Sequence, residues 1–452
     1  MRLRSRAAPA FTRRVKQKGR SAPGPSSPPS HRCRACRGRL ERRATCGRPT
    51  RDDAASRRDP LVTAAAHIQL DDRGGAARKE ARMTPSAQSR SLRAELDSLR
   101  QEFAAKIGPR DAEYIRTVRA VARVSRVTGR LLIHFSLEPV TWAAGVCALA
   151  TYKVLENMEI GHNVLHGQYD FMRDPTLSSA TYEWDMVGTA KSWKRAHNAT
   201  HHVFTNVIGR DRDFGYNAFR FSAEVPWKPI HLLQPLVSPL SGLFFEYSIG
   251  AYDLGLLDGL GPRPSGAAGG KRRPRREIAR ELWAFARKAA RKGFVEYVFY
   301  PALAGPLAAK VLCGNLLANT IRNGWAYAVI YCGHLTEQTA TFREEGLEDE
   351  DRGGWYVRQV TGSSNFEAGR LVHVLSGHLG FQIEHHLFPN VPAWRYPEMA
   401  PRVRAICERH GIPYSTGSLA SQFASAMRRL VRFAVPGAER RGGADGARAH
   451  AA

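Results

Sequence analysis

The amino-acid sequence predicts an all-α fold: an integral membrane bundle of helices with a helical cap on its cytoplasmic side. Three observations predict this fold. Three long apolar regions are separated by polar and charged segments. Basic residues are concentrated in segments that flank these regions. Nine of the sixteen histidines fall in four tight groups at the edges of the apolar regions.

The average composition, taken alone, would indicate a different class of protein. The chain has 452 residues, with 68 Lys and Arg against 41 Asp and Glu and a formal net charge of +27. Its mean hydropathy is −0.38, which is typical of a soluble protein that binds anions. However, residues 1–82 hold 22 basic and only 7 acidic residues. More than half of the excess charge therefore lies in this stretch. The net charge is thus a poor guide to the partner of the rest of the chain, and we do not expect a nucleic acid as partner.

Both ends of the chain are predicted to be disordered. Residues 1–82 are rich in Arg, Ala, Pro and Ser and lack a sustained apolar period, so they cannot bury enough surface to fold. They also lack the apolar run of a secretory signal. Because Met83 opens a more ordinary sequence, we hypothesise that it is the biological start and that the basic tail is not native. Residues 437–452 form a second predicted tail.

The seven cysteines show no disulfide framework, which favours a reducing compartment. Cys33 and Cys36, with Cys46 and His31, resemble part of a zinc knuckle. A second spaced pair is missing, so plain composition is the favoured interpretation.

Amphipathic helices are predicted for residues 83–130, with a helical pattern over 90–130. Its apolar positions include Leu92, Leu96 and Leu99. Further along, Val118, Val121 and Val124 lie opposite Arg116, Arg119, Arg123, Arg126 and Arg130. An arginine face beside an apolar stripe suits a helix on an anionic membrane surface. A helix packed on its own protein is an equally good interpretation.

The predicted membrane domain covers residues 131–436. Its apolar regions are Leu131–Met158, Ile230–Leu257 and Gly293–Leu335. The first is broken at Glu138 and Pro139, which predicts a bent helix pair, and the third is long enough for a helical hairpin. The basic linker 261–292 is expected on the cytoplasmic side. A hairpin that starts there, crosses the membrane and crosses back would place His334, at its end, on the cytoplasmic side as well.

The histidine groups predict a metal site. They comprise His162 and His166; His197, His201 and His202; His334; and His378, His385 and His386, with Gln382 one turn before His386. Histidines four residues apart on a helix deliver two ring nitrogens to one ion. Without His378, eight histidines remain, which exceed the needs of one tetrahedral zinc and suggest two ions. A zinc protease is disfavoured because Asn163 replaces the glutamate of its motif.

Acidic residues flank the first two groups. Among them, Glu159 and Asp211 are candidates for the metal site or for hydrogen bonds to its histidines, because ligand imidazoles usually donate their second N–H to a carboxylate or carbonyl. A solvated loop charge is the alternative for any one of them.

The three motifs HNVLH, HNATHH and QIEHH, in this order and beside these apolar regions, resemble the histidine boxes of the membrane fatty acid desaturase family. The segments ENMEIGHNVLHGQYDFM and FQIEHHLFPNVPAWRYPEMAPRV are most similar to bacterial acyl-CoA desaturases of the actinobacterial stearoyl type. The resemblance covers roughly residues 112–425.

The resemblance implies a non-haem di-iron centre that uses O₂. Its ligands would be the box histidines His162, His166, His197, His201, His202, His385 and His386, with His334 as an additional ligand. Gln382 stands where many members have His, and His378 stands where relatives often have a small or amide residue. No catalytic residue beyond the metal ligands is implied.

The resemblance also implies a cis-desaturation of an acyl-CoA or lipid-linked acyl chain, in a bacterial plasma membrane with the boxes facing the cytoplasm. The chain has no His-Pro-Gly-Gly haem motif, so two electrons would come from a separate ferredoxin, reductase or cytochrome b5. Trp325, Tyr327 and Tyr331 are candidates for the lining of an acyl tunnel, although plain membrane packing is the favoured interpretation for each. Lys271, Arg272, Arg273, Arg275 and Arg276 would attract acyl-CoA phosphates or simply fix the topology.

Two other functions compete with desaturation. A hydroxylase or ketolase would use the same metal site and differ only in what is transferred to the substrate. A non-catalytic metal transporter or sensor would need polar residues inside the apolar crossings, and only Arg322 and Asn323 are candidates for that role.

Overall fold

In the computed structural model, the described residues are 85–256, 274–345, 347 and 349–437. The N-terminal tail with Met83 and the Cys33 motif, the linker residues Lys271–Arg273, and nearly all of the C-terminal tail lie outside this part. The described chain contains no β-strand, only the isolated bridges Val207–Phe342 and Glu367–Ser418. The all-α prediction is therefore confirmed.

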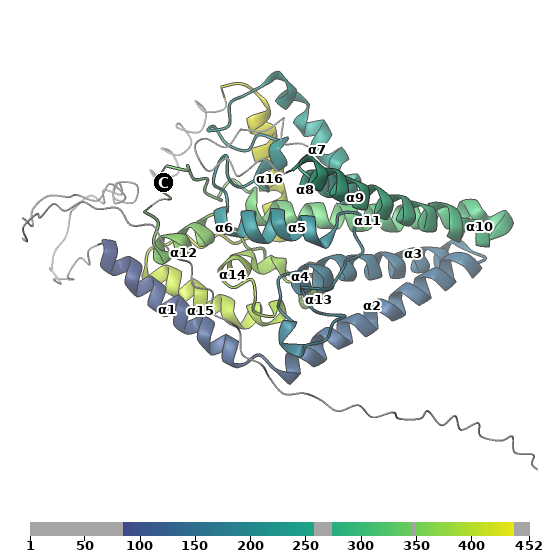
Figure 1. The fold of residues 1–452 in the computed structure, drawn as a ribbon, viewed down its shortest axis with the longest axis horizontal. Helices are drawn as coiled ribbons and strands as arrows, with labels where there is room; N and C mark the ends of the chain where they lie inside the picture. Colours follow the sequence, from purple (N-terminus) through teal and green to yellow (C-terminus); the bar gives the residue numbers. More distant parts are fainter. Residues whose placement is uncertain (1–84, 257–273, 346, 348, 438–452) are drawn as a thin grey trace, which may run out of the picture. The chain divides into compact units, whose positions relative to one another are not determined.

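Sixteen α-helices and several short helical turns make up the described fold (Figure 1). The α-helices are α1 (Pro85–Ala105), α2 (Pro109–Phe135), α3 (Pro139–Val154), α4 (Asn163–Leu165), α5 (Ala190–Ala196), α6 (His202–Phe204), α7 (Gln234–Leu243), α8 (Phe245–Asp253), α9 (Arg275–Phe294), α10 (Tyr300–Leu303), α11 (Ala308–His334), α12 (Arg352–Thr361), α13 (Arg370–Leu375), α14 (Gln382–Leu387), α15 (Tyr396–Arg409) and α16 (Leu419–Ala434). Three π-helical segments join them: η2 (Leu155–His162), η4 (His197–His201) and η7 (Val295–Phe299).

The N-terminal helical segment differs from the prediction. One pattern was predicted over 90–130, but the chain forms α1 and α2 with a break at residues 106–108. Pro109 starts the second helix, where its missing N–H costs nothing. The Asp111 carboxylate accepts the Gly108 N–H at 2.8 Å and caps the new helix. Helix α2 then runs on to Phe135, into the first apolar region.

The predicted break at Pro139 is confirmed, and it produces a tightly packed pair of helices. The Glu138 carboxylate caps α3 by accepting the N–H groups of Val140 and Thr141. Glycines let α2 and α3 approach closely, because a Cβ at Gly129 would lie 2.6 Å from the Leu149 nitrogen. A Cβ at Gly145 would lie 2.8 Å from the Ile133 nitrogen. The backbones of helices α2 and α3 are therefore in close contact at these two glycines.

The predicted hairpin in the third apolar region is also present. Its first arm begins earlier than expected, since α9, η7 and α10 run continuously from Arg275 to Leu303. After a turn, α11 returns and ends at His334. Figure 1 shows α11 lying between this arm and α3, and α11 contacts both. The second apolar region forms α7 and α8, which pack beside α11.

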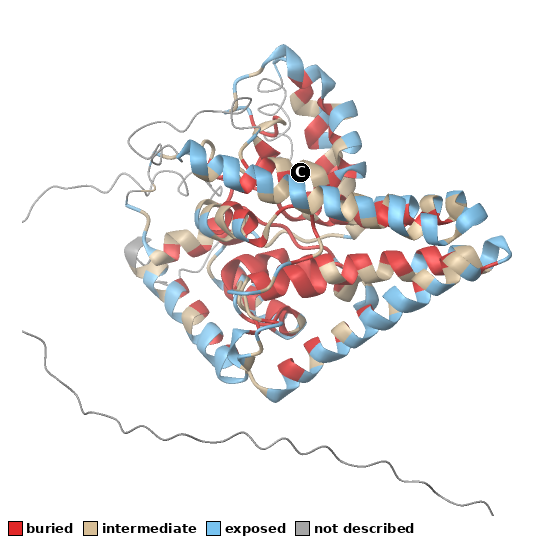
Figure 2. Ribbon diagram, turned by 45° about the vertical axis from the view of Figure 1, so that its right-hand side comes forward, coloured by how far each residue is buried: buried red, intermediate tan, exposed pale blue. Residues whose placement is uncertain are grey.

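A second cluster of helices covers the histidine-bearing ends of these pairs. Helix α1 buries Leu92, Leu96 and Leu99 against Tyr356 of α12 and Ile383 of α14. Helix α15 joins the same cluster. Figure 2 shows that the buried residues concentrate here and along the inner sides of the helix pairs. Helix α14 is thus fully enclosed, and it carries two of the predicted ligands.

Among the helices of the described ranges, none combines the length and the apolar character needed to cross a bilayer.

Candidate metal centre

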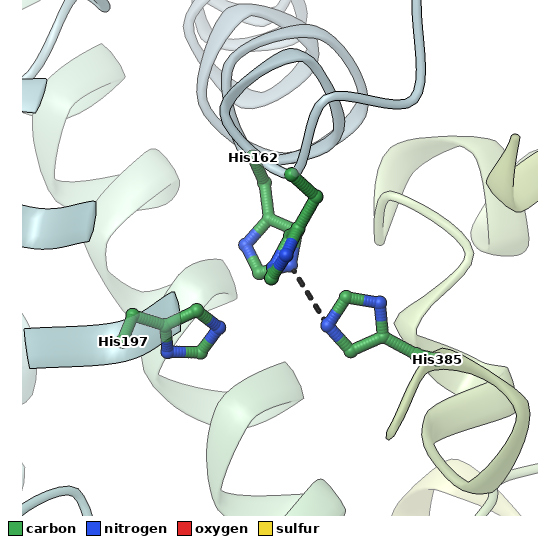
Figure 3. Close-up of side chains that lie close together, drawn as sticks. His162, His197 and His385 are labelled. Carbon is green, nitrogen blue, oxygen red and sulfur yellow. Dashed lines mark hydrogen bonds between the residues drawn. The ribbon is translucent and has the colours of Figure 1, made fainter. Parts of the chain in front are cut away.

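The eight histidines predicted as ligands come together in one buried cluster. They form adjoining groups whose ligand atoms lie within 4.8 Å of one another. The groups are His162, His166, His197 and His385; His201, His334 and His386; and His202, His385 and His386. Because His385 and His386 each belong to two groups, the cluster is continuous. Figure 3 shows His162, His197 and His385 arriving from three directions and pointing toward one another.

The first pair of histidines is presented by η2 and α4. The π-helical turn of η2 ends at His162, and His166 follows directly after α4. Their ring centroids are 4.7 Å apart. A π-helical turn inserts an extra residue into a helix, and such turns occur frequently at functional sites. The predicted one-face arrangement holds, although the helix is not a regular α-helix.

The second group is presented in a similar way by α5, η4 and α6. The Thr189 side chain caps α5 by accepting the Ser192 N–H. The helix then widens into η4, which contains His197 and His201, and His202 begins α6. The rings of His197 and His201 stack at 5.1 Å. Two separate histidine motifs therefore share the same local distortion.

The remaining histidines come from the ends of two other helices. His334 is the last residue of α11, and α14 carries His385 and His386. The Asn365 side-chain oxygen accepts the Ile383 N–H at 2.8 Å and fixes the start of α14. The Nε2 atoms of His162 and His385 are 3.2 Å apart, a pair marked by the dashed line in Figure 3.

His201 and His334 show why the cluster suits a cation. The Nδ1 of His201 donates to the Asp211 carboxylate at 2.9 Å, and the Nδ1 of His334 donates to the Gly362 carbonyl at 3.0 Å. A neutral imidazole has only one N–H, so both Nε2 atoms are left as lone pairs. These two lone pairs face each other at 3.2 Å. The arrangement is repulsive unless a positive charge, from a metal ion or a proton, lies between them.

Two further Nε2 ring nitrogens of the cluster have no hydrogen-bond partner among the described residues. His166 Nε2 and His386 Nε2 are buried without a hydrogen bond. Ligand nitrogens bound to one ion at about 2.0–2.1 Å lie about 3.0–3.4 Å apart, which matches the 3.2–3.3 Å between facing Nε2 atoms here. The residues present therefore fit metal ions in both number and spacing.

Electrostatics favour the neutral, ligand-competent form for most of these rings. Burial lowers the pKa of His162 to about 3 and that of His334 to about 3. Burial alone would also lower the pKa of His201, but the Asp211 and Asp213 carboxylates outweigh it and raise that pKa.

Several residues that orient the histidines were not singled out by the sequence. Asp213 accepts from His197 Nδ1 at 3.0 Å, and it was only one of many flanking acids. Gln359 of α12 accepts from His386 Nδ1 at 2.9 Å. The Thr205 hydroxyl donates to this Gln359 oxygen at 2.8 Å. Gln359 precedes His386 by 27 residues in a segment without a motif, so no sequence signal pointed to it.

The four further candidates, Asp211, Gln382, Glu159 and His378, have distinct positions. Asp211 contacts His201 as described above. The Gln382 amide lies 2.8 Å from His334 Nε2, directly at the cluster. Glu159 and His378 form a separate buried pair with a 3.0 Å contact, and the Tyr114 hydroxyl donates to Glu159 at 2.7 Å. Neither belongs to the groups of potential metal ligands.

A narrow cavity of about 60 Å³ adjoins the histidines. Apolar side chains line it, including Met158, Met186, Ile249, Ile330 and Leu335, together with His162, His197, His201 and His334. The candidate tunnel residues Trp325, Tyr327 and Tyr331 are not among its lining residues, and they pack in the core instead, which was the favoured interpretation. Tyr327 and Tyr331 instead turn toward α7 and make hydrogen bonds with the Ser238 hydroxyl at 2.9 and 2.8 Å.

The polar hairpin residues Arg322 and Asn323, the candidates for a metal-transport pathway, make contacts between helices instead. Arg322 is buried and paired with Glu246 of α8. Asn323 donates to the Leu243 carbonyl at 2.7 Å. Both side chains thus fasten α11 to the α7–α8 region.

The helical fold and its eight enclosed histidines define a class of candidate metal-binding proteins, here with a cavity beside the candidate metal site. Comparison with known proteins identifies the family within this class. A sequence model of the family described as "Fatty acid desaturase" matches residues 140–418. The chain therefore belongs to the fatty acid desaturase family, and it is an oxidoreductase of lipid metabolism, as the histidine boxes implied.

Individual relatives agree with this assignment. The chain is 39% identical over 362 residues to an NADPH-dependent stearoyl-CoA 9-desaturase of Mycobacterium tuberculosis, which covers 79% of this chain and 82% of the relative. It is 25% identical to an sn-1 linoleoyl-lipid 6-desaturase of Arthrospira platensis, over 71% of this chain and 87% of that one. It is 26% identical to an acyl-lipid (7-3)-desaturase of Rebecca salina, over 61% and 60% of the two chains.

Proposed function

We propose that the protein introduces a cis double bond into the acyl chain of a fatty acyl-CoA, using O₂ and two electrons from a separate redox protein. The observation that carries the proposal is the apolar cavity that ends on the buried histidines. The 39% identity to a stearoyl-CoA desaturase over most of both chains supports acyl-CoA as the substrate. A lipid-linked acyl chain is the second candidate, since two other relatives are named for acyl-lipid substrates.

We infer that the cluster holds two iron ions. His162, His166, His197 and His385 would be the main ligands of one ion, and His201, His334 and His386 those of the other, with His202 beside both sets. When bound, the two irons and O₂ supply the oxidising power that removal of hydrogens from unactivated methylenes requires.

The protein's own side chains have three tasks in this proposal. Asp211, Asp213 and Gln359 hold His201, His197 and His386 in the tautomer that directs a lone pair at the metals. The apolar side chains of the lining would contact the part of the acyl chain beside the histidines. Fixing one pair of adjacent methylenes beside the histidines selects where the double bond forms.

We further propose that the protein is held in the bacterial plasma membrane with the histidines on the cytoplasmic side. Exposed apolar side chains gather at the ends of the helix pairs that are remote from the histidines. They include Phe135, Leu137 and Val140 at the α2–α3 turn, and Val298, Phe299, Leu303 and Leu307 near the turn before α11. Along α7, Leu236, Leu240 and Leu243 are exposed as well. A surface of this kind is typical of contact with lipid.

The proposed domain organisation keeps the membrane desaturase domain at residues 131–436, preceded by the amphipathic helices of 83–130. Within that domain the hairpin returns His334 to the face on which the other histidines lie. The basic residues Arg275 and Arg276 begin α9, at the end of the first arm away from the turn before α11, which supports a cytoplasmic position for them.

The test is the fatty acid profile of a host that expresses the full chain with an electron-transfer partner. Gas chromatography should show a new monoene that is missing when His385 is replaced by Ala. A hydroxy or keto acid instead of a monoene would establish the hydroxylase or ketolase alternative. The position of the double bond would define regioselectivity.

A further inference from the structure

Helix α2 carries three stripes of side chains along its length. One is buried and packs on the protein, with Ile115, Val118 and Ala122. A second is apolar but exposed: Val121, Val124, Val127, Leu131 and Phe135 are between 49% and 76% exposed. At 100° per residue, a third stripe lies between these two and consists of Arg116, Arg119, Arg123, Arg126 and Arg130. Figure 2 shows the exposed outer side of this helix.

Three of these arginines border a cavity of about 270 Å³. Its lining residues are Arg119, Ala122, Arg123 and Arg126 of α2, Tyr152 of α3, Glu156 of η2, and Tyr182. The cavity is distinct from the one beside the histidines, since the two have no lining residue in common. It lies at the end of the α2–α3 pair that is closer to the histidines.

In the described part of the chain, the three arginines outnumber the single acid that lines this cavity. In the described ranges no ion pair involves Arg119, Arg123 or Arg126; Arg119 donates to the Thr176 hydroxyl at 2.9 Å, and Arg126 lies 5.4 Å from the Tyr152 ring centroid. Glu156 is the one acid in the lining, and its carboxylate accepts the Tyr182 hydroxyl at 2.6 Å. Burial raises the pKa of Glu156, which weakens it as a counter-charge.

We propose that this cavity binds the phosphate of an anionic phospholipid, whose acyl chains lie along the exposed apolar stripe of α2. Guanidinium groups bind phosphate through paired N–H donors. The apolar stripe begins beside the arginines on the same helix, so one amphiphile satisfies both surfaces. A soluble phosphate compound has no acyl chains that would cover the exposed apolar stripe. The site would hold α2 at the membrane surface in a defined rotation.

Native mass spectrometry of the full chain in neutral detergent tests this site. The probes are phosphatidylglycerol and, separately, phosphatidylcholine. The variant Arg119→Gln/Arg123→Gln/Arg126→Gln should lower the apparent affinity for phosphatidylglycerol at least about fivefold. The matched control is Arg90→Gln/Arg93→Gln/Arg100→Gln, which removes the same charge from exposed positions of α1. This control should bind phosphatidylglycerol like the wild type.

A single variant, a comparison of the two lipids and two soluble competitors complete the test. Arg123→Gln alone, at an exposed position without a protein partner to lose, should weaken binding by a smaller factor without changing the melting temperature. Equal binding of phosphatidylcholine and phosphatidylglycerol would overturn the proposal, as would equal losses in both triple variants. Displacement of the lipid by coenzyme A or by inorganic phosphate at equal concentration would also overturn it, because the phosphate would then come from a soluble source.

Discussion

At the scale of single residues, the carboxylate behind His201 controls whether that ring can bind metal. Asp211 accepts from His201 Nδ1 and from the Asn206 N–H, so it fixes both the ring and the loop after α6. The sequence identified Asp211 as a candidate because it follows the second histidine group closely. It offered no comparable signal for Gln359, which reaches His386 only through the packing of α12 on α14.

Asp211→Asn should reduce metal affinity about 10- to 100-fold. The amide keeps the size of the side chain, but its NH₂ end cannot accept from His201 Nδ1. Chelator competition measures the affinity, and Asp349→Asn, at an exposed acid, is the matched control. If the Asp211 variant retains wild-type affinity with its loop intact, Asp211 does not orient the ligand.

At the scale of helices, the motifs were easier to predict than their exact shapes. The four-residue spacing of His162 and His166 correctly placed both rings on one side of a helical segment. It could not reveal that the segment is π-helical, because a four-residue spacing is equally compatible with a regular α-helix. The break at residues 106–108 was similarly missed, although Gly108 and Pro109 are a recognisable start of a helix.

The close contact of α2 and α3 gives a testable consequence for stability. Gly145→Ala should destabilise the protein by about 1–3 kcal/mol, because the new Cβ would collide with the Ile133 nitrogen. Gly324→Ala is the control, since nothing lies within 4 Å of its Cβ position in α11. That change should be neutral or stabilise by about 0.5–1 kcal/mol. Denaturant unfolding in detergent measures both, and equal effects would show that the α2–α3 contact is looser than described.

At the scale of the whole molecule, an internal ion-pair network joins the helix pairs. Glu246 of α8 contacts both Arg322 of α11 and Lys292 of α9. Close to this group, Glu296 pairs with Arg130 at 2.7 Å and with Lys153 at 3.2 Å. From the sequence alone, Arg322 was a candidate for a transport pathway. Its partner Glu246 could not be predicted, because tertiary packing, and not sequence spacing, determines which residues pair with a buried charge.

Glu246→Met should destabilise the protein by about 3–5 kcal/mol, because it leaves Arg322 buried without its partner. Adding Arg322→Met to that variant should restore much of the loss. Glu408→Gln, at an exposed pair with Arg404, should change stability by no more than about 1 kcal/mol. If the double variant were as unstable as the single one, the unpaired charge would not be the cause.

Average composition was the least informative property of the whole chain. Its net charge and negative mean hydropathy suggested a soluble anion-binding protein, whereas the distribution of apolar regions and histidines led to the family. The basic residues of α2 and α9 belong to the folded protein, and we assign those of α2 to a lipid headgroup.

The most direct test of the central claim is the metal content of the purified full chain, measured by inductively coupled plasma mass spectrometry after iron loading under reducing conditions. We predict about two iron ions per chain, with loss of most of the iron in His385→Ala, whose ring belongs to one ligand set and also lies beside His202 and His386. Glu408→Gln should keep the wild-type content. A chain that retains no iron, or that keeps two irons after His385→Ala, would contradict the account.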